Sequence, residues 1–146
     1  MLINSMGFIK FVIIFSTFFF NHSLIKADNF SDAAILETQN IIENQIQAFI
    51  SEDSERAFSY AAPMIKLRFN NADEFMSMVK SYYEPVYNPK QYYFINSKYL
   101  ENSIYHQLQV VSQSNVSYLA TYSLIKENEE WKISGCAVYP MQQQSI

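Results

Sequence analysis

The sequence has 146 residues, of which 49% are hydrophobic and 16% are charged, a composition typical of a single folded domain. It contains two glycines, Gly7 and Gly135, and one cysteine, Cys136. This scarcity excludes glycine-rich phosphate loops, intrachain disulfides and clusters of thiolate metal ligands. We therefore expect neither a metal ion nor a cofactor.

The first 27 residues have the layout of a secretory signal peptide. Residues 1–10 carry one lysine and no acid, and residues 11–20 (FVIIFSTFFF) form an apolar stretch. This stretch is too short for a membrane-spanning helix, which needs about 20 apolar residues. We expect cleavage after Ala27, which would leave an exported protein, periplasmic or secreted, without stable membrane insertion. The alternative is that residues 1–20 remain as a membrane anchor.

Charge argues against a nucleic-acid partner. Removal of residues 1–27 leaves 8 basic against 14 acidic residues. The basic residues stand singly between acids, whereas nucleic-acid-binding surfaces gather lysines and arginines on one face. The mature chain is long enough to fold around one core without disulfides.

The first half of the mature chain has helical patterns. Residues 31–50 place apolar side chains at helical spacing, which predicts an amphipathic helix. Asp53 is the expected N-cap of a second, short helix that ends before Pro63, where the proline restarts a helical turn. Asn71, with Glu74 three positions later, predicts the start of a third helix, which ends at the next proline.

In the second half, side chains alternate between two faces with a period of two, which predicts β-strands. In the first strand this alternation is uninterrupted, so Tyr93, Ile95 and Ser97 are expected to share one face. Short polar turns between the strands predict an antiparallel meander. Three N-terminal helices packed on one face of a four-stranded antiparallel sheet make an α+β domain over residues 28–140, with a disordered tail over residues 141–146. The predicted strands cover residues 92–99, 104–111, 116–125 and 131–139.

Three segments resemble known families. Residues 45–63 (QIQAFISEDSERAFSYAAP) are similar to the opening of cone-shaped domains of the nuclear transport factor two and ketosteroid isomerase type. Residues 75–89 (FMSMVKSYYEPVYNP) together with residues 131–136 (WKISGC) resemble an uncharacterised bacterial family, domain of unknown function 4864. The resemblance covers nearly the whole mature chain and implies a cone-shaped fold with a curved sheet. Since that family has no assigned activity, the resemblance implies no catalytic residues.

The candidate site residues lie on two of the predicted strands. His106, the only histidine of the mature chain, shares a face with apolar residues. It is either a buried general base or a hydrogen-bonded structural residue, and we favour the second because no orienting partner is visible. In a cone-shaped fold, Tyr118 and Tyr122 would share a pocket with His106 and bind a ligand there. These strand faces carry no acid, which argues against the enolisation chemistry that the ketosteroid isomerase resemblance implies.

Two further features are interpreted as packing. Cys136 has no positive charge beside it, so we expect a buried, unreactive thiol, and Gly135 is expected to mark a bulge or a close approach in the last strand. The tyrosine-rich residues 82–93 are interpreted as a linker pinned across the junction between helices and sheet. The alternative is an aromatic partner surface.

The sequence therefore favours an exported, non-catalytic binding or assembly domain. Its partner would be a small apolar ligand or a protein, and homodimerisation through the sheet stays open. The alternative is a small-molecule enzyme of the ketosteroid isomerase type that uses His106 with a pocket tyrosine.

Overall fold

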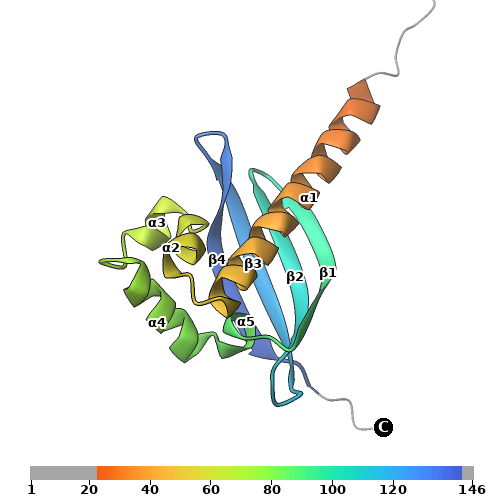
Figure 1. Ribbon diagram of the computed structural model, residues 1–146. Helices are drawn as coiled ribbons and strands as arrows, with labels where there is room; N and C mark the ends of the chain where they lie inside the picture. Colours follow the sequence, from red (N-terminus) through yellow and green to blue (C-terminus); the bar gives the residue numbers. More distant parts are fainter. Residues whose placement is uncertain (1–22, 143–146) are drawn as a thin grey trace, which may run out of the picture.

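The computed structural model describes residues 23–142 and confirms the α+β fold (Figure 1). Figure 1 shows α1 lying across one face of the sheet and its first turns extending past the sheet. Residues 1–22 of the predicted signal peptide and most of the predicted tail lie outside the described residues, and the expected cleavage point falls within α1. The elements are α1 (Ser23–Ile50), α2 (Ser54–Ser59), α3 (Pro63–Lys66), α4 (Ala72–Tyr82), α5 (Glu84–Tyr87), β1 (Gln91–Leu100), β2 (Ser103–Val111), β3 (Ser117–Glu127) and β4 (Glu130–Pro140).

Two helices begin at the predicted caps. The Asp53 carboxylate accepts a hydrogen bond from the Arg56 backbone N–H at 3.1 Å, and the Asn71 side chain accepts one from the Glu74 N–H at 2.9 Å. Each bond satisfies a backbone donor that the first helical turn leaves free. The N–H of Asn70, one residue before the cap, donates to the Glu74 carboxylate at 2.8 Å.

One short helix was not predicted. Pro85 lies in the first turn of α5, so it begins a new helical turn after α4 has ended at Tyr82. Proline suits this position because N–H groups in the first turn of a helix have no acceptor within the helix. A residue without an N–H therefore loses no hydrogen bond there. The predicted group of three helices is therefore a group of five, of which α3 and α5 have four residues each.

The sheet is the predicted antiparallel meander, with strand order β1-β2-β3-β4. Its helix-covered face carries the main core, in which α1 packs against the strands. The buried residues of this core include Ile42, Ile46, Ile104, Leu108, Val110, Ala120, Leu124, Trp131 and Ile133.

A bulge interrupts each outer strand. In β1 the register shifts between Phe94 and Asn96, so the uninterrupted alternation expected there is wrong: Ile95 is an extra residue. Phe94 and Ser97 consequently face the same side, although they are three positions apart. In β4 the register shifts at Ser134, beside Gly135, which confirms the bulge predicted at this glycine.

A second core packs the end of α1 against α2, α4 and α5. Tyr87 is buried in it, and its hydroxyl donates to the Glu52 carboxylate at 3.1 Å. Tyr87 is therefore an anchor within the tyrosine-rich segment, whereas Tyr82 and Tyr93 at its two ends are exposed. The members of the second core are Ala48, Phe49, Ala57, Phe75, Met76, Val79 and Tyr87.

The connection between α2 and α3 is tied to β4 by the backbone. The Ala62 N–H donates to the Ile133 carbonyl, and the Ile133 N–H donates to the Tyr60 carbonyl, both at 2.8 Å. These bonds hold α3, and the turn that follows it, against the last strand.

Candidate ligand-binding site

A cavity of about 190 Å³ lies between the two cores. Residues of the main core, such as Ile133, line it together with residues of the second core, such as Phe75. Its lining residues are Gln45, Phe49, Ala61, Ile65, Arg68, Phe69, Phe75, Met78, Val79, Tyr83, Val86, Tyr122, Ile133, Ser134, Gly135 and Cys136.

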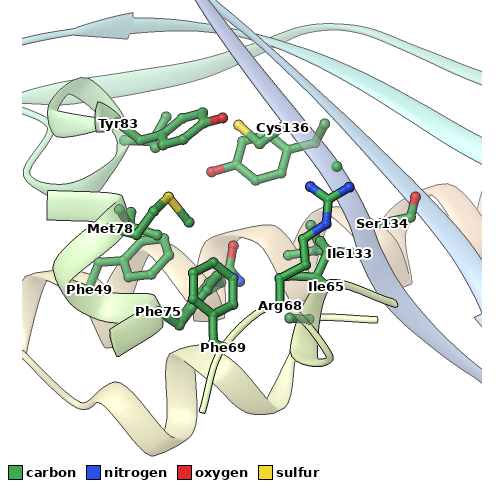
Figure 2. Close-up of a pocket in the computed structure, with 16 residues that line it drawn as sticks. Phe49, Ile65, Arg68, Phe69, Phe75, Met78, Tyr83, Ile133, Ser134 and Cys136 are labelled. Atoms are coloured by element: carbon green, nitrogen blue, oxygen red, sulfur yellow. The ribbon is translucent and has the colours of Figure 1, made fainter. Parts of the chain in front are cut away.

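The walls of the cavity are mostly apolar. Figure 2 shows Phe69 and Phe75 on one wall, Met78 and Tyr83 on a second, and Cys136 on the opposite side. The Phe69 and Phe75 rings meet edge to face, with centroids 5.4 Å apart. An apolar cavity of about 150 Å³ is enough to hold a benzene molecule. This cavity therefore has room for a ligand body of roughly the size of one ring.

Tyr122 contributes a buried polar atom. Its side chain is 1% exposed, and its hydroxyl makes no hydrogen bond to oxygen or nitrogen among the described residues, although it does interact with the Cys136 thiol. Burial raises the pKa of this hydroxyl well above its usual value, so it stays protonated. An unpaired buried hydroxyl costs roughly 1–3 kcal/mol relative to a bonded one. The cavity therefore contains a donor whose polar neighbour, the Cys136 thiol, is only a weak acceptor.

Cys136 is the cross-strand partner of Tyr122. Ile133 and Cys136 are three positions apart, yet the extra residue Ser134 brings both to the helix-covered face. Cys136 packs against the main core and lines the cavity, so the thiol expected to be buried is buried only in part. Burial raises the pKa of Cys136 to about 12, and the neighbouring Tyr122 side chain only partly opposes this rise. The group is a neutral thiol and not a nucleophilic thiolate.

His106 lies beside the cavity but does not line it. It is fully buried, and it pairs with Ser97 of β1 and Tyr122 of β3. Ser97 reaches it because the β1 bulge turns Ser97 to the inner face. The edge of the Phe94 ring packs against the imidazole, with centroids 5.6 Å apart.

Both ring nitrogens of His106 have partners. The Thr38 hydroxyl donates to the Ala34 carbonyl at 2.8 Å, so its oxygen accepts from Nε2–H at 2.7 Å. The Gln39 amide donates to Ser97 Oγ at 3.2 Å, and the Ser97 hydroxyl then donates to Nδ1 at 2.7 Å. This network fits a neutral imidazole with its proton on Nε2. Burial lowers its pKa to about 4, which agrees with that state.

The structure thus brings one of the three predicted site residues into the cavity. Tyr118 lies on the same strand as Tyr122 and is half-buried, but it does not line the cavity. His106 is fully buried and is not in the lining. Of these three residues, only Tyr122 lines the cavity.

Arg68 is a lining residue that sequence reasoning missed. It stands in the turn after α3, between Leu67 and Phe69. Figure 2 shows its side chain running along one side of the cavity, with the guanidinium between Cys136 and Ser134. In the sequence, Arg68 is a single cation between two apolar residues, and the chain has more acids than bases. This pattern does not distinguish it from an ordinary surface arginine.

The cavity continues into a groove between the end of α4 and the end of β4. Met78, Tyr83 and Cys136 line both spaces. The groove has a volume of about 450 Å³. Tyr82 and Tyr139 flank it and are both exposed.

Comparison with known proteins assigns the chain to a family. Residues 31–146 match the family described as Domain of unknown function (DUF4864), so the chain belongs to that family. The fold is similar to that of an NTF2-like protein of unknown function from Shewanella baltica OS155, known from a crystal structure at 1.75 Å resolution. The two chains are 8% identical, with a TM-score of 0.49, and the match covers 84% of this chain and 100% of the other. No curated protein matches the sequence.

Residues 23–142 contain no group of three or more histidine, cysteine or acidic side chains that could hold a metal ion. Within the same residues, no helix is long and apolar enough to cross a membrane.

Proposed function

We propose that this protein is an exported, non-catalytic binding domain that takes a small, mostly apolar molecule into the cavity. The observation that carries the proposal is the Tyr122 hydroxyl, which is buried in a mostly apolar cavity and has only the Cys136 thiol as a weak polar partner among the described residues. A ligand with one hydrogen-bonding oxygen would pair with this hydroxyl more strongly than the thiol does. The rest of the ligand would replace water against the phenylalanine rings.

The chemistry of the lining favours binding over catalysis. In the described part of the chain, the lining contains no aspartate, glutamate or histidine, the side chains that most often act as general bases. The raised pKa values of Tyr122 and Cys136 keep both groups protonated near neutral pH. The enzyme alternative has less support, because His106 lies outside the lining and both of its ring nitrogens are bonded.

The test uses two probes of similar shape, 4-ethylphenol and ethylbenzene, with binding followed by ligand-observed NMR and calorimetry. We expect the phenol to bind, and Tyr122→Phe to weaken its binding by about fivefold, since one hydrogen bond contributes about 1 kcal/mol. Tyr118→Phe is the matched control, because Tyr118 lies on the same strand outside the cavity, and it should leave binding unchanged. Failure of both probes to bind the wild type, or equal effects of the two substitutions, would contradict the proposal.

Export is tested separately. The proposal expects the exported protein to begin near Asp28. N-terminal sequencing of protein taken from outside the cytoplasm gives the answer, and a retained residue 1 would favour the membrane anchor.

A further inference from the structure

We propose that the ligand of this cavity is a small carboxylic acid whose carboxylate pairs with Arg68, while its apolar body lies on Phe69 and Phe75. This inference rests on the proposed function, since it names the chemical class of the molecule that the cavity binds. Three independent features of the cavity support it: an unpaired guanidinium, a lining without acids, and limited space.

The Arg68 guanidinium is free to bind an anion. Among the described residues, its side chain has no hydrogen bond and no ion pair, whereas Lys80 and Lys132 both pair with glutamates. Figure 2 shows the guanidinium beside the cavity, on the side of Ile133 and Ser134. The Arg68 side chain is exposed and no carboxylate of the described residues neutralises it, so its guanidinium can pair with the carboxylate of a ligand.

The backbone holds Arg68 in place. Its N–H donates to the Ile65 carbonyl at 3.0 Å, and the next residue, Phe69, donates to the Lys66 carbonyl at 3.2 Å. The preceding helix α3 is tied to β4 through Ala62. Arg68 and Phe69 therefore start from a fixed turn, so only the Arg68 side chain, and not the backbone, has to be ordered when a ligand binds.

The surroundings select the kind of anion. Arg68 is the one charged residue in the lining, and no acid there competes for it. A guanidinium fork matches the two oxygens of a carboxylate, giving a pair of charge-assisted hydrogen bonds. A phosphate dianion carries more charge and more acceptors than a single arginine satisfies. The volume of about 190 Å³ fits a body of roughly one ring.

The sheet side of the cavity, next to the groove, adds a second point of recognition. The Tyr122 hydroxyl and the Cys136 thiol meet there as neighbouring protonated groups. A ligand with an oxygen at the end opposite its carboxylate would pair with Tyr122. The arrangement therefore favours an acid with two polar ends and an apolar middle.

The experiment compares 3-phenylpropionate with its uncharged analogue 3-phenylpropan-1-ol at neutral pH, by calorimetry on the full protein. We expect the acid to bind about tenfold more tightly than the alcohol, as one charge-assisted pair would give. Arg68→Gln should remove that preference and leave the affinity for the alcohol within about twofold. Lys66→Gln is the matched control, because the Lys66 ammonium lies over the Phe58 ring, 5.5 Å from its centroid, and is outside the lining.

The outcomes separate the two proposals. If both probes bind equally and Arg68→Gln changes neither, the carboxylate assignment is wrong while the binding function stands. If phenyl phosphate binds more tightly than the acid, the site is an anion site of another class, and the assignment is again wrong. If no probe binds the wild type, the binding function itself fails. Arg68 is exposed, so an unchanged thermal midpoint of the Arg68→Gln protein checks that its fold is intact.

Discussion

The Thr38 hydroxyl lies 2.7 Å from Nε2 of His106, and this contact joins helix α1 to an inner strand of the sheet. Both side chains are fully buried. A polar pair in such a place costs free energy unless every donor and acceptor is satisfied, and here the network from Gln39 to Ala34 satisfies them. The imidazole thus acts as a neutral connector between two layers.

This connector makes stability depend on pH. Because burial lowers the pKa of His106 from 6.5 to about 4, the unfolded chain takes up a proton at a higher pH than the folded protein does. The free energy of unfolding should therefore fall as pH drops from 6.5 to 4, by up to about 3 kcal/mol. Urea unfolding across this range measures the effect.

The control for this prediction is His106→Gln. The variant keeps the carboxylates that also titrate in acid, so its own pH dependence can be subtracted from that of the wild type. The difference should grow with pH between 4 and 6.5 and then level off. Parallel curves would show that His106 is not the group responsible.

Cys136 should react slowly. With its pKa raised to about 12, the folded protein holds far less thiolate at pH 8 than an unfolded thiol does. The smaller fraction of thiolate slows the reaction, and the higher nucleophilicity of a thiolate with a high pKa offsets part of this effect. We therefore expect Cys136 of the folded protein to react with an aromatic disulfide reagent roughly 30-fold more slowly than Cys136 of the protein unfolded in urea. The rate should still be rising at pH 10. A rate that levels off near pH 9 would contradict the raised pKa.

The close approach at Gly135 predicts a coupling with Ser123. A Cβ atom at position 135 would lie 3.0 Å from Ser123 Oγ, which is bonded to Ser134 Oγ at 2.9 Å. In the Ser123→Ala background, Gly135→Ala should stabilise the protein by about 0.5 kcal/mol, because alanine restricts the unfolded chain. In the wild-type background the displaced serine should cancel this gain. Equal effects in both backgrounds would exclude the coupling.

Removal of the Asn71 cap should lower the stability of the protein. Asn71→Ala removes the acceptor for the Glu74 N–H and should lower the free energy of unfolding by about 1 kcal/mol. Asn102→Ala makes the same chemical change in the exposed turn between β1 and β2 and should have almost no effect. Denaturant midpoints compare the two variants, and similar losses would contradict a capping role.

The sequence revealed those features that depend on neighbouring residues. Helix starts at Asp53 and Asn71, the four strands and the bulge at Gly135 all have local signals, because caps, periodicity and glycine act within a few positions. The β1 bulge had none, since Ile95 is apolar and continues the alternation in the sequence.

The cavity depends on packing and could be predicted only in part. Tyr122 was found because strand alternation places it on the inner face. His106 shares that face, but Thr38 of α1 covers it, and the sequence contains no signal for where a helix crosses a sheet. Arg68, Met78 and Cys136 come from three separate elements, so their meeting depends on how the two cores pack against each other.

The groove beside the cavity has a practical consequence. Because Met78, Tyr83 and Cys136 line both spaces, the cavity opens at this end and does not close around its contents. At this open end, the cavity limits the width of a ligand more than its length. A reporter group attached to the end of a ligand could leave past Tyr82 and Tyr139 into solvent, so labelled or resin-bound acids are suitable baits for this protein.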